Sequence, residues 1–301
     1  MPTIRQSLIA NFTRRYPFYS GCASLANKSL VHNLAGESYE SVCAPVPGGE
    51  VLASLNDYVG RSAFYMGDLD RKLTWICSQI IRPGDTVMDI GANIGIVTLW
   101  LSKLVGQTGQ VHAFEPNPEL QKILNATIDR NQVSNVCLHP IALGAEPGQL
   151  ELRVPKVNAG NASLIYHRNL SDCDVFEVPV RPLSQIMEEN HITSIRLIKI
   201  DVEGFEANVL KGAQKIFESV RPEAILFELN ERWEGLIPDQ PVIKILRDLG
   251  YGFFSIPRCL LHMHLERFDP DRSTQLIGHD FLAVPQGDCY ERIAKLVNAN
   301  S

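Results

Sequence analysis

The sequence has 301 residues, of which 45% are hydrophobic and 21% are charged, and its formal net charge is −6. This length allows one large globular domain with an N-terminal extension, or two small domains. The acidic balance argues against a protein that binds nucleic acid by bulk electrostatics. Seven cysteines without a C-x-x-C spacing indicate neither a zinc ribbon nor a disulfide framework, so we expect reduced thiols and a cytoplasmic protein.

The N-terminal stretch has neither the apolar core of a signal peptide nor the length of a transmembrane segment. Its aromatic residues, from Phe12 to Tyr19, are expected to pack over the core, over a substrate cleft, or against a second copy in a homodimer. Peripheral membrane contact through the first 20 residues is a further alternative. A break rich in proline and glycine at residues 45–49 predicts an extension over residues 1–50 and a main domain over residues 51–301.

After this break we expect a strand or hairpin arm at residues 51–58, then a loop at residues 65–68. Apolar residues at helical spacing predict a helix up to residue 80, with Asp70 as its cap. The turn at residues 82–85 then leads into the stretch on which the interpretation of the whole chain depends.

Residues 86–117 read as a strand, a glycine turn, a helix and a second strand that ends in an acid. The run V-M-D-I before Gly91 is typical of a buried parallel strand. The spacing of apolar residues from Ile96 to Leu104 predicts an amphipathic helix. This βαβ order is the one that holds nucleosides in open α/β sheets.

The acid at the end of the second strand indicates how such a unit binds its ligand. Glu115 stands about 20 residues after the glycine turn, where a carboxylate accepts hydrogen bonds from ribose hydroxyls. A dinucleotide site needs a second glycine for the backbone to approach a pyrophosphate, and Asn93 stands at that position. The turn therefore favours a nucleoside ligand without phosphates, such as S-adenosylmethionine (SAM). Asp89 is placed to face the ammonium group of SAM.

Further elements follow in the alternating order of an α/β fold. We expect a helix from Pro118, a strand at 136–138, and a segment at 141–144 that passes beside an adenine ring or simply leaves the strand. A hairpin is expected from residues 150–154 and 175–180, and the small polar residues 158–164 between them form a substrate loop or a plain surface loop. Three more helices are expected, at residues 183–190, 205–217 and 241–249, and the second of them is expected to bend or split at Gly212. They alternate with expected strands at residues 195–200, 223–229, 251–256 and 281–284. A helix or tail ends the chain.

A third acid falls at a strand end in the motif K-I-D-V-E-G. Asp201 stands at the end of a buried strand, as Asp89 and Glu115 do. Ligands of open parallel sheets bind beyond the carboxyl ends of the strands, so these three acids are expected to meet at one site.

The motifs M-D-I-G-A-N-I-G, F-E-P-N, K-I-D-V-E-G and R-P-E-A-I-L-F-E-L together resemble the FkbM family of SAM-dependent methyltransferases over about residues 80–230. The resemblance implies a Rossmann-like α/β fold with a seven-stranded, mostly parallel sheet, its last strand antiparallel, and helices on both faces. It implies methyl transfer, usually to a hydroxyl of a sugar, glycan or natural product. The cofactor contacts that it implies belong to Asp89, Gly91, Asn93, Gly95, Glu115, Pro116, Ala142 and Asp201.

Methyl transfer to an alcohol needs a base that accepts the hydroxyl proton. Asp201 and Glu203 are the first candidates, and His167, which follows the small-residue loop, is a third. Mg²⁺ held by Asp201, Glu203 and Glu228 is an alternative way to activate the acceptor, although no spacing demands a metal. Charges in the first helical turn, such as Glu203, also have a purely structural explanation in the helix dipole.

Three other functions stay open at this point. The first is an N-methyltransferase for an amine or peptide, since cofactor motifs do not encode the nucleophile. The second is a SAM-binding subunit without catalysis. An NAD-dependent oxidoreductase is disfavoured by Asn93 at the glycine position. The expected partner is a small molecule or a glycan, with no nucleic acid.

Overall fold

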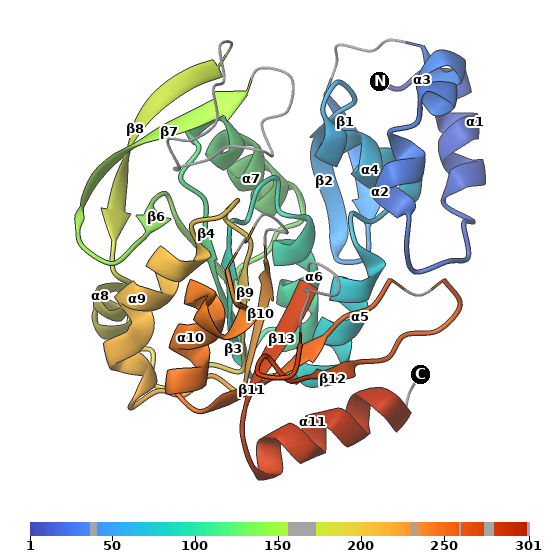
Figure 1. The fold of residues 1–301 in the computed structure, drawn as a ribbon. Helices are drawn as coiled ribbons and strands as arrows, with labels where there is room; N and C mark the ends of the chain where they lie inside the picture. The colour runs from blue at the N-terminus through green and yellow to red at the C-terminus, as the bar shows by residue number, and fades with distance from the viewer. Residues whose placement is uncertain are drawn as a thin grey trace.

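The computed structural model describes residues 1–36, 41–155, 173–229, 233, 235–258, 260–273 and 280–299. In this part of the chain an eight-stranded sheet forms the centre, with helices on both of its faces (Figure 1). Across the sheet the strands are β12 (Glu266–Phe268), β11 (Tyr251–Ser255), β13 (Asp280–Pro285), β10 (Ala224–Glu228), β9 (Leu197–Ile200), β3 (Thr86–Ile90), β4 (Gln110–Phe114) and β5 (Val136–His139).

The directions of these strands confirm the expected mostly parallel sheet. Strands β5, β4, β3, β9 and β10 pair in parallel, whereas β13, the last strand, is antiparallel to both of its neighbours. The sheet has one strand more than the seven expected, because the three-residue strand β12 pairs with the edge of β11. So short a strand carries no alternating pattern that a sequence argument can detect.

Two sets of helices bury the two faces of the sheet, which explains why its strands are apolar throughout. One face packs against α5 (Arg71–Ile80), α6 (Ile96–Val105), α7 (Pro118–Arg130) and α11 (Asp288–Ala299). The other face packs against α8 (Leu183–Glu189), α9 (Glu206–Phe217) and α10 (Pro241–Asp248), the last preceded by a 3₁₀ turn (Ile237–Asp239). None of the helices in the described ranges combines the length and apolar character that a bilayer crossing requires.

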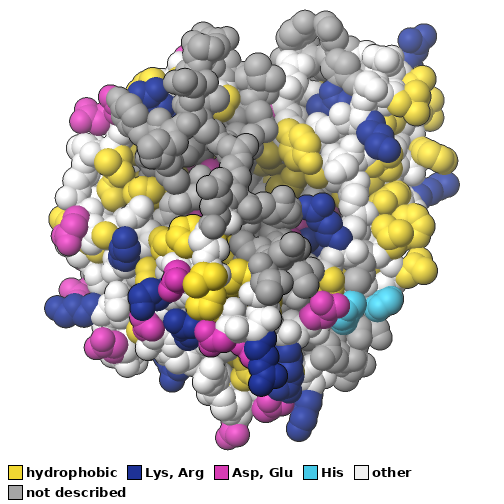
Figure 2. All heavy atoms as spheres, viewed as in Figure 1, with side chains coloured by type: hydrophobic (Ala, Val, Ile, Leu, Met, Phe, Trp, Pro, Cys, Tyr) yellow, Lys and Arg dark blue, Asp and Glu magenta, His cyan; other side chains and the backbone are white. Residues whose placement is uncertain are grey.

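An N-terminal layer packs beside this sandwich, on α6 and α7. It consists of α1 (Ile4–Thr13), α2 (Cys22–Ala26), α3 (Ser29–Ala35), the hairpin of β1 (Ser41–Val46) and β2 (Gly49–Ser54), and α4 (Tyr58–Met66). Thr127 and Asn131 of α7 accept hydrogen bonds from the backbone of β2. The hairpin thus straddles residue 50, the expected boundary of the extension. Figure 2 shows hydrophobic side chains gathered over α1 and α3, with Lys and Arg among them.

The expected loop at residues 65–68 is wrong in its first half, because α4 continues to Met66. This helix is buried on nearly every side, so it lacks the polar face by which an amphipathic helix is recognised. The cap of the following helix is confirmed, since Asp70 accepts a hydrogen bond from the backbone N–H of Lys72 at 2.9 Å.

A small second sheet lies beside the main one and contains β6 (Ala142–Leu143), β7 (Gly148–Pro155) and β8 (Cys173–Arg181). Strands β7 and β8 form the predicted antiparallel hairpin. The small-residue loop predicted within it, together with His167, lies outside the described residues.

The expected bend at Gly212 is wrong, since α9 runs unbroken past it. A Cβ atom at this glycine would lie 2.0 Å from the carbonyl oxygen of Gly144. Gly212 therefore allows the helix to approach the backbone after β6, a reason that only the tertiary structure reveals.

Candidate functional site

The order of the strands creates a crevice at one point of the sheet. From β3 the chain proceeds outward through β4 to β5, and it then returns to the other side of β3 to form β9 and β10. The loops that follow β3 and β9 therefore diverge, which leaves space beyond the carboxyl ends of the strands. A cavity of about 670 Å³ occupies this space. It is lined by Gly91, Asn93, Glu115, Ala142, Asp201 and Glu228, among others.

The glycine turn after β3 forms one wall of the cavity. Gly91 has a φ of +84°, and a Cβ atom there would lie 1.9 Å from the carbonyl oxygen of Asp201. A side chain at this position would therefore push the ends of β3 and β9 apart. The N–H groups of Gly91 and Ala92 donate to the carbonyl of Phe114, which ties the turn to the end of β4.

Glu115 holds the same turn from the other side. Its Oε2 accepts from the N–H of Asn93 at 2.8 Å, and its Oε1 accepts from the N–H of Asn117 at 2.9 Å. Asn93 reaches this position through a left-handed backbone, with a φ of +53°. Burial raises the pKa of the Glu115 carboxyl to about 7, although the two backbone hydrogen bonds act in the opposite direction. A carboxylate has about four acceptor positions, and the two N–H donors occupy only two of them, so Glu115 can accept further hydrogen bonds from a ligand.

Lys199, which sequence reasoning missed, connects the ends of β3 and β9. Its ammonium donates to the carbonyl of Gly91 at 2.8 Å and lies 3.2 Å from Asp89 and 3.6 Å from Asp201. Burial acts to lower the pKa of Lys199, but the carboxylates of Asp89 and Asp201 outweigh it and raise the pKa above its ordinary value. Lys199 therefore stays charged, and it fixes the Gly91 carbonyl and the Asp201 carboxylate at the cavity wall.

The structure corrects the expected place of Asp89 at the ligand site. Its side chain is fully buried, accepts a hydrogen bond from the Thr98 hydroxyl at 2.6 Å, and faces Lys199 across the parallel pair of β3 and β9. It does not line the cavity. Asp89 therefore holds Lys199 beside the cavity and is not part of the cavity lining.

Carboxylates gather on the cavity side of β9 and β10. Asp201, Glu203, Glu228 and Asp280 all line the cavity, and Lys72 forms ion pairs with Asp280 and Asp70 beside them. Glu228 is accessible to water, but it lies in the cavity near the other acids. Desolvation, followed by repulsion from Asp201 and Asp280, raises the pKa of Glu228 to about 8. This group therefore exchanges a proton near neutral pH.

The N-terminal layer closes the cavity on the side of this acidic cluster. The segment from Tyr16 to Ser24, between α1 and α2, lines it together with residues at the start of α5. The guanidinium of Arg71 donates to the carbonyls of Tyr16 and Phe18. The expectation that N-terminal aromatics cover a cleft thus holds for Tyr16 and Tyr19, whereas Phe12 is exposed at the surface.

The structure brings most of the predicted residues together. Gly91, Asn93, Glu115, Pro116, Ala142, Asp201 and Glu203 line one cavity. Gly95 does not, because it packs on Leu124 of α7, where a Cβ atom would come within 2.5 Å of the leucine side chain. Lys199 had a usable signal in the sequence, since it stands two residues before Asp201 and therefore on the same face of β9.

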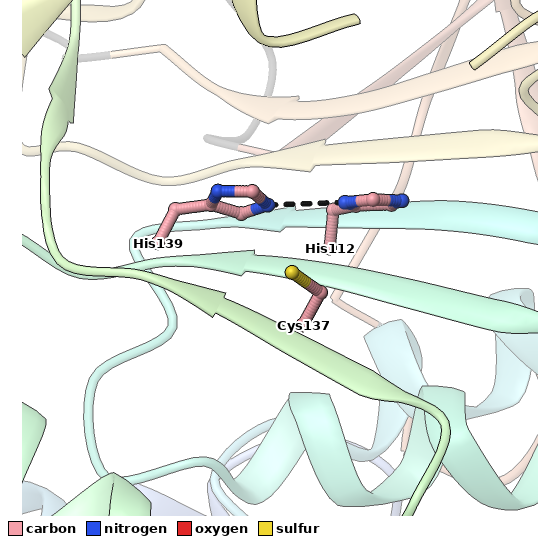
Figure 3. A group of neighbouring side chains, drawn as sticks. All are labelled: His112, Cys137 and His139. Atoms are coloured by element: carbon pink, nitrogen blue, oxygen red, sulfur yellow. Dashed lines mark hydrogen bonds between the residues drawn. The ribbon is translucent and has the colours of Figure 1, made fainter. Parts of the chain in front are cut away.

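Among the described residues, three side chains form a close group of potential metal ligands, and they lie away from the acidic cluster. His112, Cys137 and His139 project from the same face of β4 and β5, with ligand atoms within 4.8 Å of one another (Figure 3). The two rings are hydrogen-bonded, with His112 Nδ1 3.0 Å from His139 Nε2. Burial lowers the pKa of His112 to about 4 and also lowers that of His139. The two histidines therefore form a neutral pair that joins the two strands. Asp201, Glu203 and Glu228 form no such close group.

With a doubly wound sheet and a ligand cavity at its switch point, the chain has the architecture of a nucleoside-binding enzyme. The sequence model of the Methyltransferase FkbM domain matches residues 89–253, more than half of the chain. The protein therefore belongs to the FkbM methyltransferase family.

Curated relatives are similar over different shares of their length. Methyltransferase 1 of Beauveria bassiana is 28% identical over 149 residues, 43% of this chain and 59% of the relative. The 31-O-demethyl-FK506 methyltransferase FkbM of Streptomyces tacrolimicus is 29% identical over 235 residues, 69% of this chain and 87% of the relative. Hexuronic acid methyltransferase AglP of Haloferax volcanii is 25% identical over 166 residues, 54% of this chain and 62% of the relative. The chain thus spans less than two thirds of the first and third of these proteins.

Proposed function

We propose that the protein transfers a methyl group from SAM to a hydroxyl of a sugar, a glycan or a natural-product small molecule. The observation that carries this proposal is Glu115, a buried carboxylate with spare acceptor positions, in a cavity whose glycine turn has Asn93 in place of a glycine. A ribose offers two hydroxyl donors to such a carboxylate. A pyrophosphate would meet both the Asn93 side chain and the acids of the cavity.

The residues present fit SAM in size and in chemistry. A cavity of about 670 Å³ lies within the range of sites for ligands of this size. Glu115 would hold the ribose, and the apolar residues Ile141, Ala142 and Leu143 would lie along the adenine. Asp201, fixed by Lys199, would face the ammonium of the amino-acid tail. When bound, SAM supplies an electrophilic methyl group on a sulfonium.

The chain's own contribution to the reaction is to position the acceptor and to take its proton. The acceptor would enter between the N-terminal layer and the carboxylates of Asp201, Glu203 and Glu228. An alcohol becomes a competent nucleophile as its proton moves to a base, and a base works best when its pKa is close to the working pH. Glu228, whose pKa is raised to about 8, meets that condition and is our first candidate for the proton acceptor. Asp201 and Glu203 remain the other candidates.

The class of acceptor is inferred from two relatives. Their printed names describe a methyltransferase for 31-O-demethyl-FK506 and one for a hexuronic acid, and both molecules contain hydroxyl groups. The acids on the acceptor side of the cavity, with Lys72 beside them, provide hydrogen-bond partners for a polyhydroxylated molecule.

Two experiments test this function. Calorimetric titration of the full chain with SAM, and separately with NAD, should show binding of SAM alone. Mass spectrometry after incubation with SAM and a pool of sugars, glycans, polyketide alcohols, amines and peptides should then find a product about 14 Da heavier than one of the hydroxyl compounds, the mass of one added methylene. Binding of NAD without binding of SAM would refute the cofactor assignment, and methylation confined to amines would refute the choice of acceptor.

A further inference from the structure

The first helix presents an apolar stripe to solvent. Ile4, Leu8 and Phe12 of α1 are 81%, 63% and 79% exposed. A spacing of four residues places them on one side of the helix. The opposite side of α1 is anchored, since Ala10 and Thr13 are buried and the Thr13 hydroxyl donates to the carbonyl of Tyr65. The exposure of the stripe is therefore fixed by the fold.

The helix is also formed before any partner arrives. Thr3 and Gln6 make a reciprocal capping box, in which each side chain accepts from the other residue's N–H, at 3.2 and 2.8 Å. Such caps stabilise a helix start. The neighbouring helix α3 packs against α1 and adds Leu30 and Leu34, which are 66% and 57% exposed. Large side chains exposed together in this way mark an interaction surface.

The charged residues within residues 1–36, which contain both helices of this surface, all have one sign. Residues 1–36 contain four of the 28 Lys and Arg residues and none of the 34 Asp and Glu residues, so they carry +4 while the remainder of the chain carries −10. Arg5, Arg15 and Lys28 are exposed beside the apolar side chains. Figure 2 shows Lys and Arg side chains among the hydrophobic ones on this face of the molecule.

We propose that this face, defined by the exposed residues of α1 and α3, docks on an anionic lipid surface. Apolar side chains with flanking cations are what an interfacial helix needs to enter the headgroup region. A second copy of the chain fits the face less well, because a twofold contact would place Arg5, Arg15 and Lys28 of one copy against the same cations of the other, with no acid within residues 1–36 of either copy. The remainder of the chain, at −10, is repelled by the same lipids and so orients the molecule.

Docking of this face would hold the cavity at the lipid surface. The segment that follows α1 directly, from Tyr16 to Ser24, is part of the cavity wall. A molecule anchored in the same bilayer would thus reach the cavity by lateral diffusion. The proposal concerns the surface of α1 and α3 and holds whatever the reaction in the cavity.

The test is co-sedimentation of the full chain with vesicles of phosphatidylcholine alone, or with one third phosphatidylglycerol, at low and high salt. We expect binding to the anionic vesicles that weakens as salt increases. The double variant Leu8→Ser/Phe12→Ser should lose about tenfold or more of this binding, because it removes two exposed apolar side chains that would enter the headgroup region. The matched control Val175→Ser/Leu236→Ser removes two exposed apolar residues elsewhere and should bind as the native chain does.

Circular dichroism and thermal melting establish that both variants are folded, so that a loss of binding reports on the surface. A native chain that stays in the supernatant with anionic vesicles would overturn the proposal. Equal loss in the control variant would also overturn it. Sedimentation velocity distinguishes the alternative occupant: a concentration-dependent dimer that Leu8→Ser/Phe12→Ser abolishes, without vesicle binding, would assign the face to a second copy.

Discussion

Glu115 combines two functions in one side chain, because it shapes the glycine turn through Asn93 and Asn117 and still has acceptor positions for a ligand. Its pKa of about 7 means that the carboxyl is partly protonated at neutral pH when no ligand is bound. A ribose hydroxyl donates to the ionised form, so binding and ionisation are linked.

We therefore predict that SAM binding weakens as pH falls through about 7. Between pH 8 and pH 6 the ionised fraction falls about tenfold, and the dissociation constant should rise by about the same factor. In Glu115→Gln this pH dependence should disappear and affinity should fall by tenfold or more. Calorimetry at pH 6, 7 and 8 measures both effects. The exposed acid Glu119, changed to Gln, is the control, and a native chain with pH-independent affinity would contradict the linkage.

Glu228 provides a separate test of the acid–base chemistry. The proton acceptor must be ionised to work, so the rate should rise with pH through about 8. Glu228→Gln should lower kcat by about 10²-fold or more and remove this rise, with little change in SAM affinity. Methyl transfer under saturating SAM from pH 6 to pH 9 measures it, with the exposed Glu218→Gln as control. A Glu228→Gln enzyme with native kcat would shift the assignment to Asp201 or Glu203.

The predicted site residues that the structure brings to the cavity are those whose placement depends on position along a strand. Glu115 and Asp201 come directly after their strands, and parallel strands bring such ends together. Asp89 lies two register positions earlier, level with Lys199, so its side chain is buried inside the sheet's helical layer and pairs with Lys199. Gly212 and Gly95 serve packing against distant backbone or side chains, for which a single sequence offers no signal.

At the scale of elements, the pair of β4 and β5 contains an unusual buried contact. His112 is fully buried and hydrogen-bonded to His139, and burial lowers its pKa to about 4. A histidine in the unfolded chain has a pKa of about 6.5, so below that pH the ring of His112 is protonated in the unfolded chain but stays neutral in the folded chain. The stability contributed by the neutral ring is complete above pH 6.5 and is lost as pH falls toward 4.

We predict that His112→Leu flattens the pH dependence of stability in this window. The native chain should lose up to about 3 kcal/mol of unfolding free energy from this group between pH 6.5 and pH 4. Urea unfolding at pH 4.5 and pH 7 measures the difference between the two proteins, which separates His112 from the carboxyls that titrate in both. The exposed His262→Gln should behave like the native chain. Equal pH slopes for native and His112→Leu proteins would show that the ring is not kept neutral by the fold.

At the scale of the whole molecule, the succession of the main strands and helices along the chain was predictable, because each βαβ step shows in the sequence as an apolar run followed by a turn. The N-terminal layer was not, because its helix α4 is buried on nearly all sides and its hairpin crosses the expected boundary. This layer is nevertheless part of the site, since its segment from Tyr16 to Ser24 closes the cavity. The extension thus acts with the sheet that follows it in sequence.

Arg71 is the link between the two parts, because its guanidinium at the start of α5 donates to the carbonyls of Tyr16 and Phe18 and lies 6.0 Å from the Tyr16 ring. Arg71→Met leaves those carbonyls without this donor and should loosen the wall on the acceptor side. We expect the KM for the acceptor to rise about three- to tenfold, a loss that corresponds to about 1 kcal/mol.

The dissociation constant of SAM should stay within about twofold, because the residues proposed to hold it lie at the ends of β3, β4 and β9 and in the β6 segment, outside the N-terminal layer. Arg82→Met, an exposed arginine at the far end of α5, should change neither constant and serves as the control. If Arg71→Met instead weakened SAM binding and left the acceptor KM unchanged, the N-terminal layer would have to be assigned to the cofactor side of the cavity. The direction of that split therefore decides which ligand the layer covers.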